Sequence, residues 1–326
     1  MIISRTPLRV SFAGGGTDIG DYYRTGHGAV VSCTIKKYVY VTVNKRFDDE
    51  IRVSYSKTEI ADSVDKIEHG LVREALRKTG IRNGIEITTI ADIPSRGTGL
   101  GSSSAITVGL LNALYAFKGH RAGPKKLAEE ACEIEINALK EPIGKQDQYI
   151  AAYGGVQHIR FNADETVALE PVICPAKTKR EIENHLMLFY TGKTRQAKDI
   201  LSKQRKNSSA NRQVLDKMRD QADRLFQDIA SLQVSKLGEA LREGWELKKS
   251  LAKDITNSEI DDMYGKAVSA GAIGGKITGA GGGGFLVLFV PPEHQWSVRN
   301  ALGGMREVEF KLEPQGSKII YVGDDY

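Results

Sequence analysis

The residues best suited to chemistry lie between positions 94 and 105, where glycines alternate with other residues and serines follow: Pro94, Gly97, Gly99, Leu100, Gly101, Ser102, Ser103 and Ser104. An apolar, helix-forming run over 105–114 comes next, so Ser102 or Ser103 is expected to cap a helix and Gly119 to end it. Glycines let the backbone approach a ligand, and a helix start supplies unpaired N–H groups and a positive dipole end. The stretch therefore favours a phosphate-binding loop over a plain glycine-rich turn.

Two other glycine-containing segments match known phosphate motifs less well. Residues 192–194 have the end of a Walker loop, but Met187 occupies the position of its first glycine. Residues 279–284 satisfy the dinucleotide-binding spacing, yet they are followed by a strand-like run over 285–290, where that motif requires a helix. The sequence therefore indicates a different kind of nucleotide loop at 97–104.

Glu135 is a first candidate for the chemistry itself. The segment 124–139 has helical periodicity, and in it Glu135 does not lie on the polar side but on a stripe shared with Ala128, Ala131, Ala138 and Leu139. A carboxylate buried in this way needs a partner. The alternatives are Mg²⁺, held together with phosphate oxygens and a hydroxyl, and an Arg or Lys side chain; the pattern favours the metal.

Asp147 is a second candidate, in a segment (141–149) that is typical of a turn entering a new helix. A carboxylate there can act as the general base that takes a proton from a substrate hydroxyl. A nearby cation would keep it ionised, and Arg9 or Lys145 could serve. Arg9 lies on the polar side of the first strand, where it could face a cleft. The alternative is an ordinary acidic residue that complements a helix dipole.

Asp18 follows the same first strand, on a glycine-rich turn over 14–17. It can accept paired hydrogen bonds from sugar hydroxyls, although taken alone the residue fits an Asx turn or a helix cap better. Lys193 and Arg195 lie in a loop after a strand-like run at 186–190. They are equally consistent with holding a substrate anion and with plain surface charge.

The overall composition limits the class of protein. The chain has 326 residues, enough for two domains, with 40% hydrophobic and 27% charged residues, as in an ordinary globular protein. A net charge of +5 suits a phosphorylated substrate and is too weak to predict nucleic-acid binding. Three cysteines without CxxC spacing indicate a reducing compartment and no structural zinc. Without a signal-peptide core or an apolar run long enough for a membrane, we expect a cytoplasmic enzyme.

Periodicity predicts the elements that must position these residues. Strands are expected at 8–13, 38–43, 85–88, 186–190, 284–290, 307–312 and 318–322, and helices at 64–79, 102–118 and 124–139. Residues 194–270 are expected to be nearly all helical, with two buried stripes: Val214, Met218, Leu225, Ile229 and Leu232, then Leu237, Leu241, Trp245 and Leu251. We predict the α+β class with antiparallel sheets and two domains, 1–180 and 181–326. The long helices could support a homodimer.

Three motifs in this order resemble those of the GHMP small-molecule kinases, which include galactokinase, homoserine, mevalonate and phosphomevalonate kinases. They are the strand and turn over 5–18, the glycine–serine loop over 99–105 and a second glycine loop over 274–284. The second motif departs from the family pattern by one extra serine before Ala105 and by a proline, Pro94, five residues before Gly99. The resemblance implies an N-terminal α/β domain with a left-handed βαβ crossover and a ferredoxin-like C-terminal domain.

The resemblance also implies an ATP-dependent kinase and a role for each candidate residue. Ser103 and Glu135 would hold Mg²⁺, Asp147 would be the catalytic base, and Arg9 would be its charge partner. The twelve positions from Glu135 to Asp147 match the galactokinase-like members. The loop from Gly97 to Ser104, with Pro94, would bind the ATP phosphates. The acceptor would be contacted by Gly15, Gly16, Thr17, Asp18, Lys193, Arg195, Lys276, Gly281 and Gly282.

Within the family, the segments 13–18, 142–149 and 190–195 are similar to those of the D-glycero-D-manno-heptose 7-phosphate kinases. Those enzymes phosphorylate the anomeric hydroxyl of a sugar 7-phosphate, which feeds nucleotide-activated heptose into surface polysaccharide. The expected partner is therefore a small sugar phosphate. Its phosphate would need a second anion site, for which Lys193, Arg195 and Lys276 are candidates. Two alternatives stay open: an L-fucose kinase or other sugar-1-kinase, and a sensor that binds sugar and ATP without turnover. Competent residues at every catalytic position argue against the sensor.

Overall fold

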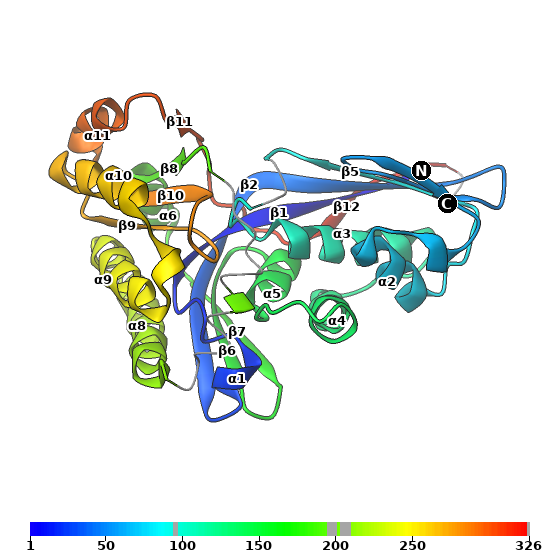
Figure 1. Cartoon of the computed structure of the whole chain (residues 1–326), viewed down its shortest axis with the longest axis horizontal. Helices are drawn as coiled ribbons and strands as arrows, with labels where there is room; N and C mark the ends of the chain where they lie inside the picture. Colours follow the sequence, from blue (N-terminus) through cyan, green and yellow to red (C-terminus); the bar gives the residue numbers. More distant parts are fainter. Residues whose placement is uncertain (94–96, 194–200, 203–209, 325–326) are drawn as a thin grey trace.

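Two β-sheets form the frame of the molecule in the computed structural model, which describes residues 1–93, 97–193, 201–202 and 210–324 (Figure 1). Within those residues the larger sheet has eight strands and the smaller has four. All strand pairs of the smaller sheet are antiparallel, as are most of those in the larger one. The predicted mixture of helices and antiparallel sheets is confirmed.

The larger sheet is built around one long strand. β2 (His27–Lys45) pairs antiparallel with β1 (Ile2–Ala13) on one side, and its second half pairs with β5 (Ile85–Ala91) on the other. The first half of β2 pairs with β6 (Val156–Asn162), which in turn pairs with β7 (Val167–Pro171). That first half is buried on both faces, since helices pack on each side of it. Its sequence is therefore apolar without strict alternation.

A single pair of parallel strands occurs among the described residues. β3 (Ile51–Ser54) pairs parallel with β5 and antiparallel with β4 (Thr58–Ala61). The chain between β3 and β5 passes through a 3₁₀ turn, η1 (Val64–Lys66), and the helix α2 (Gly70–Thr79). The continuous helix expected from residue 64 is wrong, because Ile67 has extended backbone angles and separates the two. The left-handedness of this βαβ connection stays a prediction.

The helix α3 (Ser102–Phe117) is central to the layer that covers the larger sheet, and it contacts α2, α4 (Pro124–Cys132) and α5 (Gln146–Tyr153). This confirms the helix predicted over 102–118. Gly109 lets α3 lie close to β1, because a Cβ atom there would come within 2.9 Å of the Thr6 hydroxyl oxygen. The middle of α3 is thereby held against β1, the strand that carries Arg9.

The smaller sheet consists of β8 (Leu186–Tyr190), β9 (Gly274–Ile277), β10 (Phe285–Phe289) and β11 (Arg306–Glu307). Their spatial order is β11-β8-β10-β9, with every neighbouring pair antiparallel. Counted along the chain, this order is fourth, first, third, second, which is the arrangement of a ferredoxin-like sheet. The strand predicted at 307–312 is largely wrong, because the chain leaves the sheet after two residues.

The longer helices of the second half of the chain lie on either side of the smaller sheet in Figure 1. α8 (Arg212–Ala230) and α9 (Lys236–Leu251) lie side by side below it, and α10 (Ser258–Ser269) and α11 (Gln295–Ala301) pack together above it. Both α8 and α9 also contact β1, so they reach across to the larger sheet. The mainly helical character predicted for this region is confirmed for its described residues.

One of the two predicted apolar stripes is confirmed in full, and the other is shifted. In α9 all four members are buried, whereas in α8 the stripe is shifted by one position at its start and the buried side chains are those of Leu215, Met218, Ala222, Leu225 and Ile229. Val214 is half-buried, and Leu232 is exposed after the helix has ended. Because both stripes pack inside the molecule, they leave no free apolar face on these helices for a partner, and the homodimer stays a prediction.

Shorter elements complete the described chain: α1 (Gly20–Tyr23), η2 (Glu133–Ala138), α6 (Ala176–His185), η3 (Lys253–Ile255) and η4 (Pro292–His294). The segment η2 is a π-helical turn that continues α4 without a break. The helix predicted over 124–139 therefore exists, but its last part is wider than an α-helix. Such turns change the direction in which side chains point.

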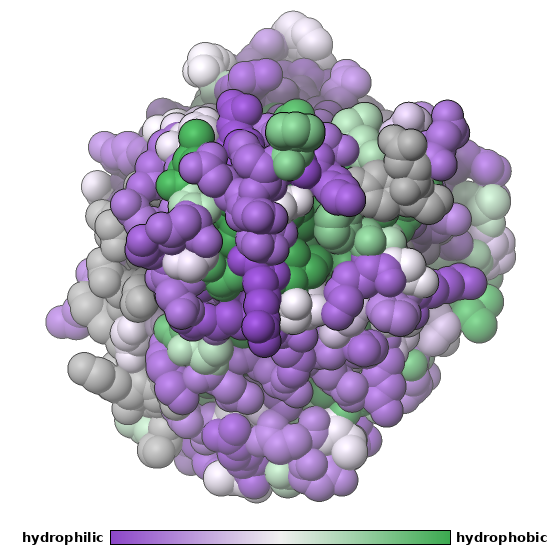
Figure 2. Space-filling model, turned by 90° about the vertical axis from the view of Figure 1, so that its right-hand side faces the viewer, coloured by the Kyte–Doolittle hydropathy of each residue, from purple (hydrophilic) through white to green (hydrophobic). Residues whose placement is uncertain are grey.

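The last strand, β12 (Lys318–Val322), returns to the larger sheet and pairs antiparallel with β1. Gly323 donates a backbone hydrogen bond of 2.8 Å to Met1, so both ends of the chain lie on the same side of the molecule (Figure 1). That side is mostly hydrophilic, with apolar side chains gathered near its middle (Figure 2). The domain boundary predicted near residue 180 stays a prediction. No described helix is both long and apolar enough to cross a bilayer.

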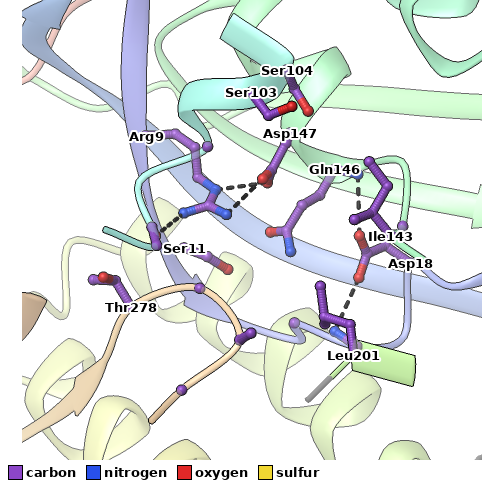
Figure 3. A pocket seen from close by; sticks show the side chains of 18 of the residues that line it. Arg9, Ser11, Asp18, Ser103, Ser104, Ile143, Gln146, Asp147, Leu201 and Thr278 are labelled. Atoms are coloured by element: carbon purple, nitrogen blue, oxygen red, sulfur yellow. Dashed lines mark hydrogen bonds and ion pairs between the residues drawn. The ribbon is translucent and has the colours of Figure 1, made fainter. Parts of the chain in front are cut away.

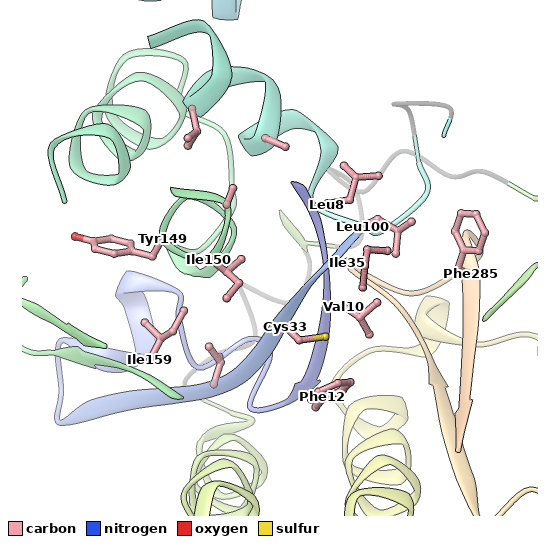
Figure 4. Close-up of a cluster of buried hydrophobic side chains, with 14 of the residues drawn as sticks. Leu8, Val10, Phe12, Cys33, Ile35, Leu100, Tyr149, Ile150, Ile159 and Phe285 are labelled. Carbon is pink, nitrogen blue, oxygen red and sulfur yellow. The ribbon is translucent and has the colours of Figure 1, made fainter. Parts of the chain in front are cut away.

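The apolar core joins the helix layer, the larger sheet and the smaller sheet (Figure 4). Leu8, Val10 and Phe12 of β1 are each at most 1% exposed, and Phe285 of β10 lies beyond them toward the smaller sheet. The residues that alternate with them in β1 are buried as well, although the sequence pattern predicts a polar face there. That face lines the pocket described below.

We expect the core around α9 to be sensitive to truncation. Trp245 is fully buried, so Trp245→Ala should lower the free energy of unfolding by about 3–5 kcal/mol, through lost burial and a new cavity. Trp296 is 73% exposed, and Trp296→Ala should change stability by no more than about 0.5 kcal/mol. Denaturant unfolding followed by far-ultraviolet circular dichroism measures both. Equal losses in the two variants would contradict this description of the core.

Candidate active site

The described residues enclose a pocket of about 280 Å³ between β1, the start of α3 and the loop after β9 (Figure 3). Segments distant in the sequence supply its walls, and most of the predicted site residues are among them: Arg9, Gly15, Gly16, Asp18, Gly97, Gly99, Gly101, Ser102, Ser103, Ser104, Glu135, Asp147, Lys276 and Gly281. The tertiary structure therefore brings these residues together in one place.

The glycine–serine loop has the backbone expected of a phosphate cradle. Gly97, Gly99 and Gly101 have φ values of 68°, 71° and 74°, in the left-handed region that favours glycine. Gly101, not Ser102 or Ser103, is the N-cap of α3, and no side chain caps the helix. The serine cap predicted from the sequence is therefore wrong. Since no side chain covers them, the first N–H groups of α3 can serve an anion.

The two glycine loops are in backbone contact. A Cβ atom on Gly99 would lie 2.4 Å from the carbonyl oxygen of Thr278, and one on Gly279 would lie 2.4 Å from the Cα of Gly99. The Thr278 hydroxyl donates a hydrogen bond of 3.1 Å to the Thr98 carbonyl. The phosphate loop of the first half is thus joined to the smaller sheet, with no room for a side chain between them.

Glu135 is fully buried on the π-helical turn η2. The Ser104 hydroxyl donates to its Oε2 over 3.0 Å and the Ser103 hydroxyl over 3.4 Å, while its Oε1 has no partner. Burial raises the pKa of Glu135 from its ordinary 4.5 to about 7. No Arg or Lys of the described residues forms an ion pair with it, so the basic partner weighed as an alternative is not found there.

Asp147 and Arg9 form a bidentate pair, as expected from the sequence. The Nε and Nη2 atoms of Arg9 each donate over 2.7 Å to the two carboxylate oxygens of Asp147. Nη1 of Arg9 donates over 2.5 Å to the carbonyl of Gly99, and its backbone N–H donates to Leu100. The guanidinium therefore fixes the carboxylate beside the phosphate loop (Figure 3). Leu100 itself is buried outside the pocket lining.

Asp18 is buried on the opposite side of the pocket, where it bridges two segments. It accepts backbone hydrogen bonds from Gly16 over 3.0 Å and from Gln146, at the start of α5, over 3.2 Å. Burial, and then the charge of Asp147, raise the pKa of Asp18. Asp18 is the N-cap neither of α1 nor of α5, so the helix cap expected as an alternative is not found, and its oxygens also face the pocket. Gly144 permits this approach, since a Cβ there would lie 2.0 Å from an Asp18 oxygen.

Two further polar residues of the pocket are not predicted from the sequence. Ser11 and Gln146 both line it, and the Ser11 hydroxyl and the Gln146 carbonyl oxygen are buried without a hydrogen-bond partner. Both lie near Gly15, within 3.7 Å of where its Cβ would be. Buried polar groups rarely stay unpaired, so these atoms are suited to a ligand rich in hydroxyls. Ser11 could have been found from the sequence, because it lies two residues after Arg9 in a strand and therefore on the same face.

Lys248 is the other residue that the sequence analysis missed. It lies on α9, is 7% exposed and lines the pocket. Burial, followed by the charge of Arg9, lowers its pKa to about 7. A usable signal was present, because Lys248 follows Leu241 and Trp245 at helical spacing and so lies on the apolar stripe. The reasoning that singled out Glu135 applies to it equally.

Some predicted contacts are not in the pocket. Lys193 points outward and forms an exposed ion pair with Glu259, and Thr17 is buried behind the pocket, where its hydroxyl donates to the carbonyls of Gly14 and Ala29. Gly282 does not line the pocket either. The predicted contacts Pro94 and Arg195 lie outside the described residues. No group of three or more His, Cys, Asp or Glu residues suited to a metal occurs in the described chain.

Comparison with known families agrees with this geometry. The family model described as GHMP kinases N terminal domain matches residues 66–155, and the model described as GHMP kinases C terminal matches residues 225–304. The chain belongs to the GHMP kinase family. The first match contains the phosphate loop with Glu135 and Asp147, and the second contains Lys248 and the second glycine loop.

Individual relatives support the same assignment. The D-glycero-alpha-D-manno-heptose 7-phosphate kinase of Campylobacter jejuni is 30% identical over 92% of this chain and 93% of that enzyme. An L-fucokinase/L-fucose-1-P guanylyltransferase of Bacteroides fragilis is 28% identical over 92% of this chain, which spans 35% of that longer protein. The crystal structure of a D-glycero-D-manno-heptose 1-phosphate kinase from Bacteroides thetaiotaomicron has a TM-score of 0.81 at 25% identity, covering 99% of this chain and all of that one.

The GHMP kinase fold and the activity class predicted from the sequence are thereby confirmed. The chain is a phosphotransferase that acts on an alcohol group, and GHMP kinases use ATP as the phosphate donor. The contact between the two glycine loops and the Arg9–Asp147 pair place the glycine–serine loop and a carboxylate on one pocket wall.

The contact between the glycine loops leads to a prediction. Gly99→Ala places a methyl group 2.4 Å from the Thr278 carbonyl, so the loops must separate, and affinity for a non-hydrolysable ATP analogue should fall about tenfold or more. Gly119→Ala is the matched control, because Gly119 has a similar φ of 75° but open space around it. It should lose about 1–2 kcal/mol of stability from backbone strain alone and bind the analogue normally. Equal affinities in the two variants would contradict the loop contact.

The buried Glu135 should make stability depend on pH. Its folded-state pKa is raised, so its stabilising contribution is complete below about pH 4.5 and is lost as the pH rises through about 7. The difference amounts to about 3 kcal/mol. Without nucleotide or metal, Glu135→Gln should therefore gain stability relative to wild type between about pH 5 and about pH 8. Denaturant unfolding at both pH values measures this, and Glu133→Gln is the control, because Glu133 lies on the same turn but is half-exposed. The same change of stability with pH in both variants would contradict the raised pKa of Glu135.

Proposed function

We propose that this GHMP kinase transfers the γ-phosphate of ATP to the anomeric hydroxyl of D-glycero-D-manno-heptose 7-phosphate and yields the 1,7-bisphosphate. The observation that carries the proposal is the Arg9–Asp147 pair, which lies between the phosphate loop and the Asp18 turn. The similarity to the Campylobacter jejuni enzyme over nearly the whole chain supports this choice of substrate.

Asp147 is proposed as the general base. Its carboxylate is held by the guanidinium of Arg9, which leaves the carboxylate oriented toward the pocket next to the phosphate loop. In this position it can accept the proton of the acceptor hydroxyl as that oxygen attacks the γ-phosphate in line. Most of the rate enhancement would come from positioning and from stabilising the charge that develops on the transferred group.

The start of α3 is proposed to hold the phosphates of ATP. Its uncapped N–H groups and the glycines before it offer backbone donors to anionic oxygens. Ser103 and Glu135 are the residues that would hold Mg²⁺, whose charge would offset that of the phosphate oxygens. They fit the ion, since Glu135 has one oxygen without a partner and already accepts a hydrogen bond from Ser103.

The sugar is proposed to bind on the side of the pocket formed by Asp18, Ser11 and Gln146. Asp18 contributes a carboxylate held by backbone N–H groups, and the other two contribute buried oxygens that lack partners. Sugar hydroxyls can donate to the carboxylate and satisfy the unpaired atoms. Gly15 and Gly16 leave room for a ring to approach the backbone.

The main alternative is an L-fucose kinase or another sugar-1-kinase, since the fucokinase of Bacteroides fragilis also covers most of this chain. Turnover with Mg²⁺ and ATP should be measured on heptose 7-phosphate, the unphosphorylated heptose, mannose, fucose and galactose. Activity confined to the 7-phosphate supports the proposal, whereas activity on a neutral sugar would identify that sugar as the acceptor instead. Binding of ATP without any turnover would favour the sensor.

Asp147→Asn tests the general base directly. The variant keeps the size of the side chain but cannot accept the proton, so turnover should fall about 100-fold or more while affinity for ATP is retained. Asp220→Asn is the control, because Asp220 also pairs with an arginine, Arg219, over 2.7 Å but lies on the surface of α8. It should turn over like wild type. Near-normal turnover in Asp147→Asn would remove Asp147 from this role.

A further inference from the structure

Two buried lysines lie together in the pocket, and neither has an acidic partner among the described residues. Lys248 on α9 is 7% exposed and Lys276 on β9 is 6% exposed, and both line the pocket. Within the part of the chain that the structure describes, their ammonium groups donate hydrogen bonds to backbone carbonyls alone. Lys276 donates over 3.1 Å to Phe12, and Lys248 donates over 3.3 Å to Ile277 and also to Gly279.

Three carboxylates of the pocket make contacts other than with the lysines. Asp147 is paired with Arg9, Asp18 accepts from backbone N–H groups, and Glu135 accepts from serine hydroxyls. No carboxylate of the described residues forms an ion pair with either lysine. Burial, the charge of Lys248 and the charge of Arg9 lower the pKa of Lys276 well below its usual range. In their charged forms the two lysines and Arg9 repel one another in a place where water screens them little, and an anion bound between the lysines would favour their charged forms.

Burying two ammonium groups without a counter-ion is costly, and a protein keeps such an arrangement where a ligand supplies the missing charge. A neutral sugar cannot do this, because its hydroxyls bring no negative charge. The α3 start already offers a separate cradle, formed by backbone N–H groups, for one set of phosphates. The two lysines lie instead on two elements of the second half of the chain. Lys276 donates a hydrogen bond to β1, and Lys248 donates one to the second glycine loop.

We propose that Lys248 and Lys276 form an anion subsite that holds a phosphate group of a bound substrate. The inference rests on the proposed function in taking that substrate to be phosphorylated, either the acceptor sugar phosphate or the nucleotide. Of the anion contacts expected from the sequence, the subsite keeps Lys276 and has Lys248 in place of Lys193, since Lys193 points away from the pocket toward Glu259. Lys248 makes the pocket selective for a ligand that carries this phosphate.

Inorganic phosphate is the probe, with binding measured by isothermal titration calorimetry on the whole protein. Wild type should bind phosphate, and Lys248→Met should weaken binding about tenfold or more, because a charge-assisted hydrogen bond is lost. Lys248→Arg keeps the charge and should retain affinity within about threefold. Lys236→Met is the matched control, since Lys236 lies on the same helix but is exposed and paired with Glu239 over 2.8 Å; it should bind like wild type.

Repeating the titration with a saturating non-hydrolysable ATP analogue determines which substrate places its phosphate in the subsite. Retained phosphate binding assigns the subsite to the acceptor, and competition assigns it to the nucleotide; either result supports the subsite. Equal affinities in Lys248→Met and Lys236→Met, or no rescue by Lys248→Arg in a folded protein, would overturn it and leave Lys248 as a structural tether of the glycine loop.

A second measurement keeps the proposal falsifiable if Lys248→Met does not fold. Phosphate should raise the thermal unfolding midpoint of wild type and of Lys248→Arg above that in chloride at equal ionic strength. The absence of such a rise in wild type would overturn the subsite. Neither readout uses turnover or a sugar, so a chain that phosphorylates another acceptor would still bind the probe, and failure of the proposed function is distinguishable from failure of the subsite.

Discussion

The Arg9 guanidinium is the interaction on which the rest of the pocket depends. Its donors engage the Asp147 carboxylate and the Gly99 carbonyl at once, while its backbone N–H binds Leu100. The strand β1, the phosphate loop and the helix α5 are therefore held by one side chain in a planar, directional geometry. Because Gly99 in turn touches the backbone of Thr278, the same side chain indirectly orients the second glycine loop.

The pocket is assembled from groups that would be costly in an ordinary core. Among the described residues, Glu135, Ser11 and Gln146 each have a buried oxygen without a partner, and Lys248 and Lys276 have no counter-ion. A protein interior normally satisfies such groups. Here the polar atoms face one cavity, which is what a binding site for a charged, hydroxyl-rich ligand requires. The pKa shifts of Glu135 and Lys248 toward 7 reflect the same burial, in opposite directions because their charged forms are of opposite sign.

The errors of sequence reasoning have local physical causes. The serine N-cap of α3 was expected because serine oxygens commonly accept from helix N–H groups, but Gly101 adopts a left-handed conformation and leaves those groups open. The helix over 64–79 is broken at Ile67, and the strand at 307–312 ends after β11. In both cases the apolar pattern is correct, but packing against other elements decides the backbone. The strand β6 is not predicted either, since its partner β2 lies more than a hundred residues away in the sequence, and β7 belongs to the sheet only through β6.

The sequence by itself determined the α3 phosphate loop, the burial of Glu135 and the family, because these depend on glycine conformation, helical periodicity and contiguous motifs. Only the tertiary structure decided which residues share the pocket. It paired Arg9 with Asp147 across the chain, turned Lys193 outward to Glu259 and brought Lys248 into the pocket. A one-dimensional pattern indicates which face of an element is buried, but the neighbours that meet that face are set by how distant elements pack.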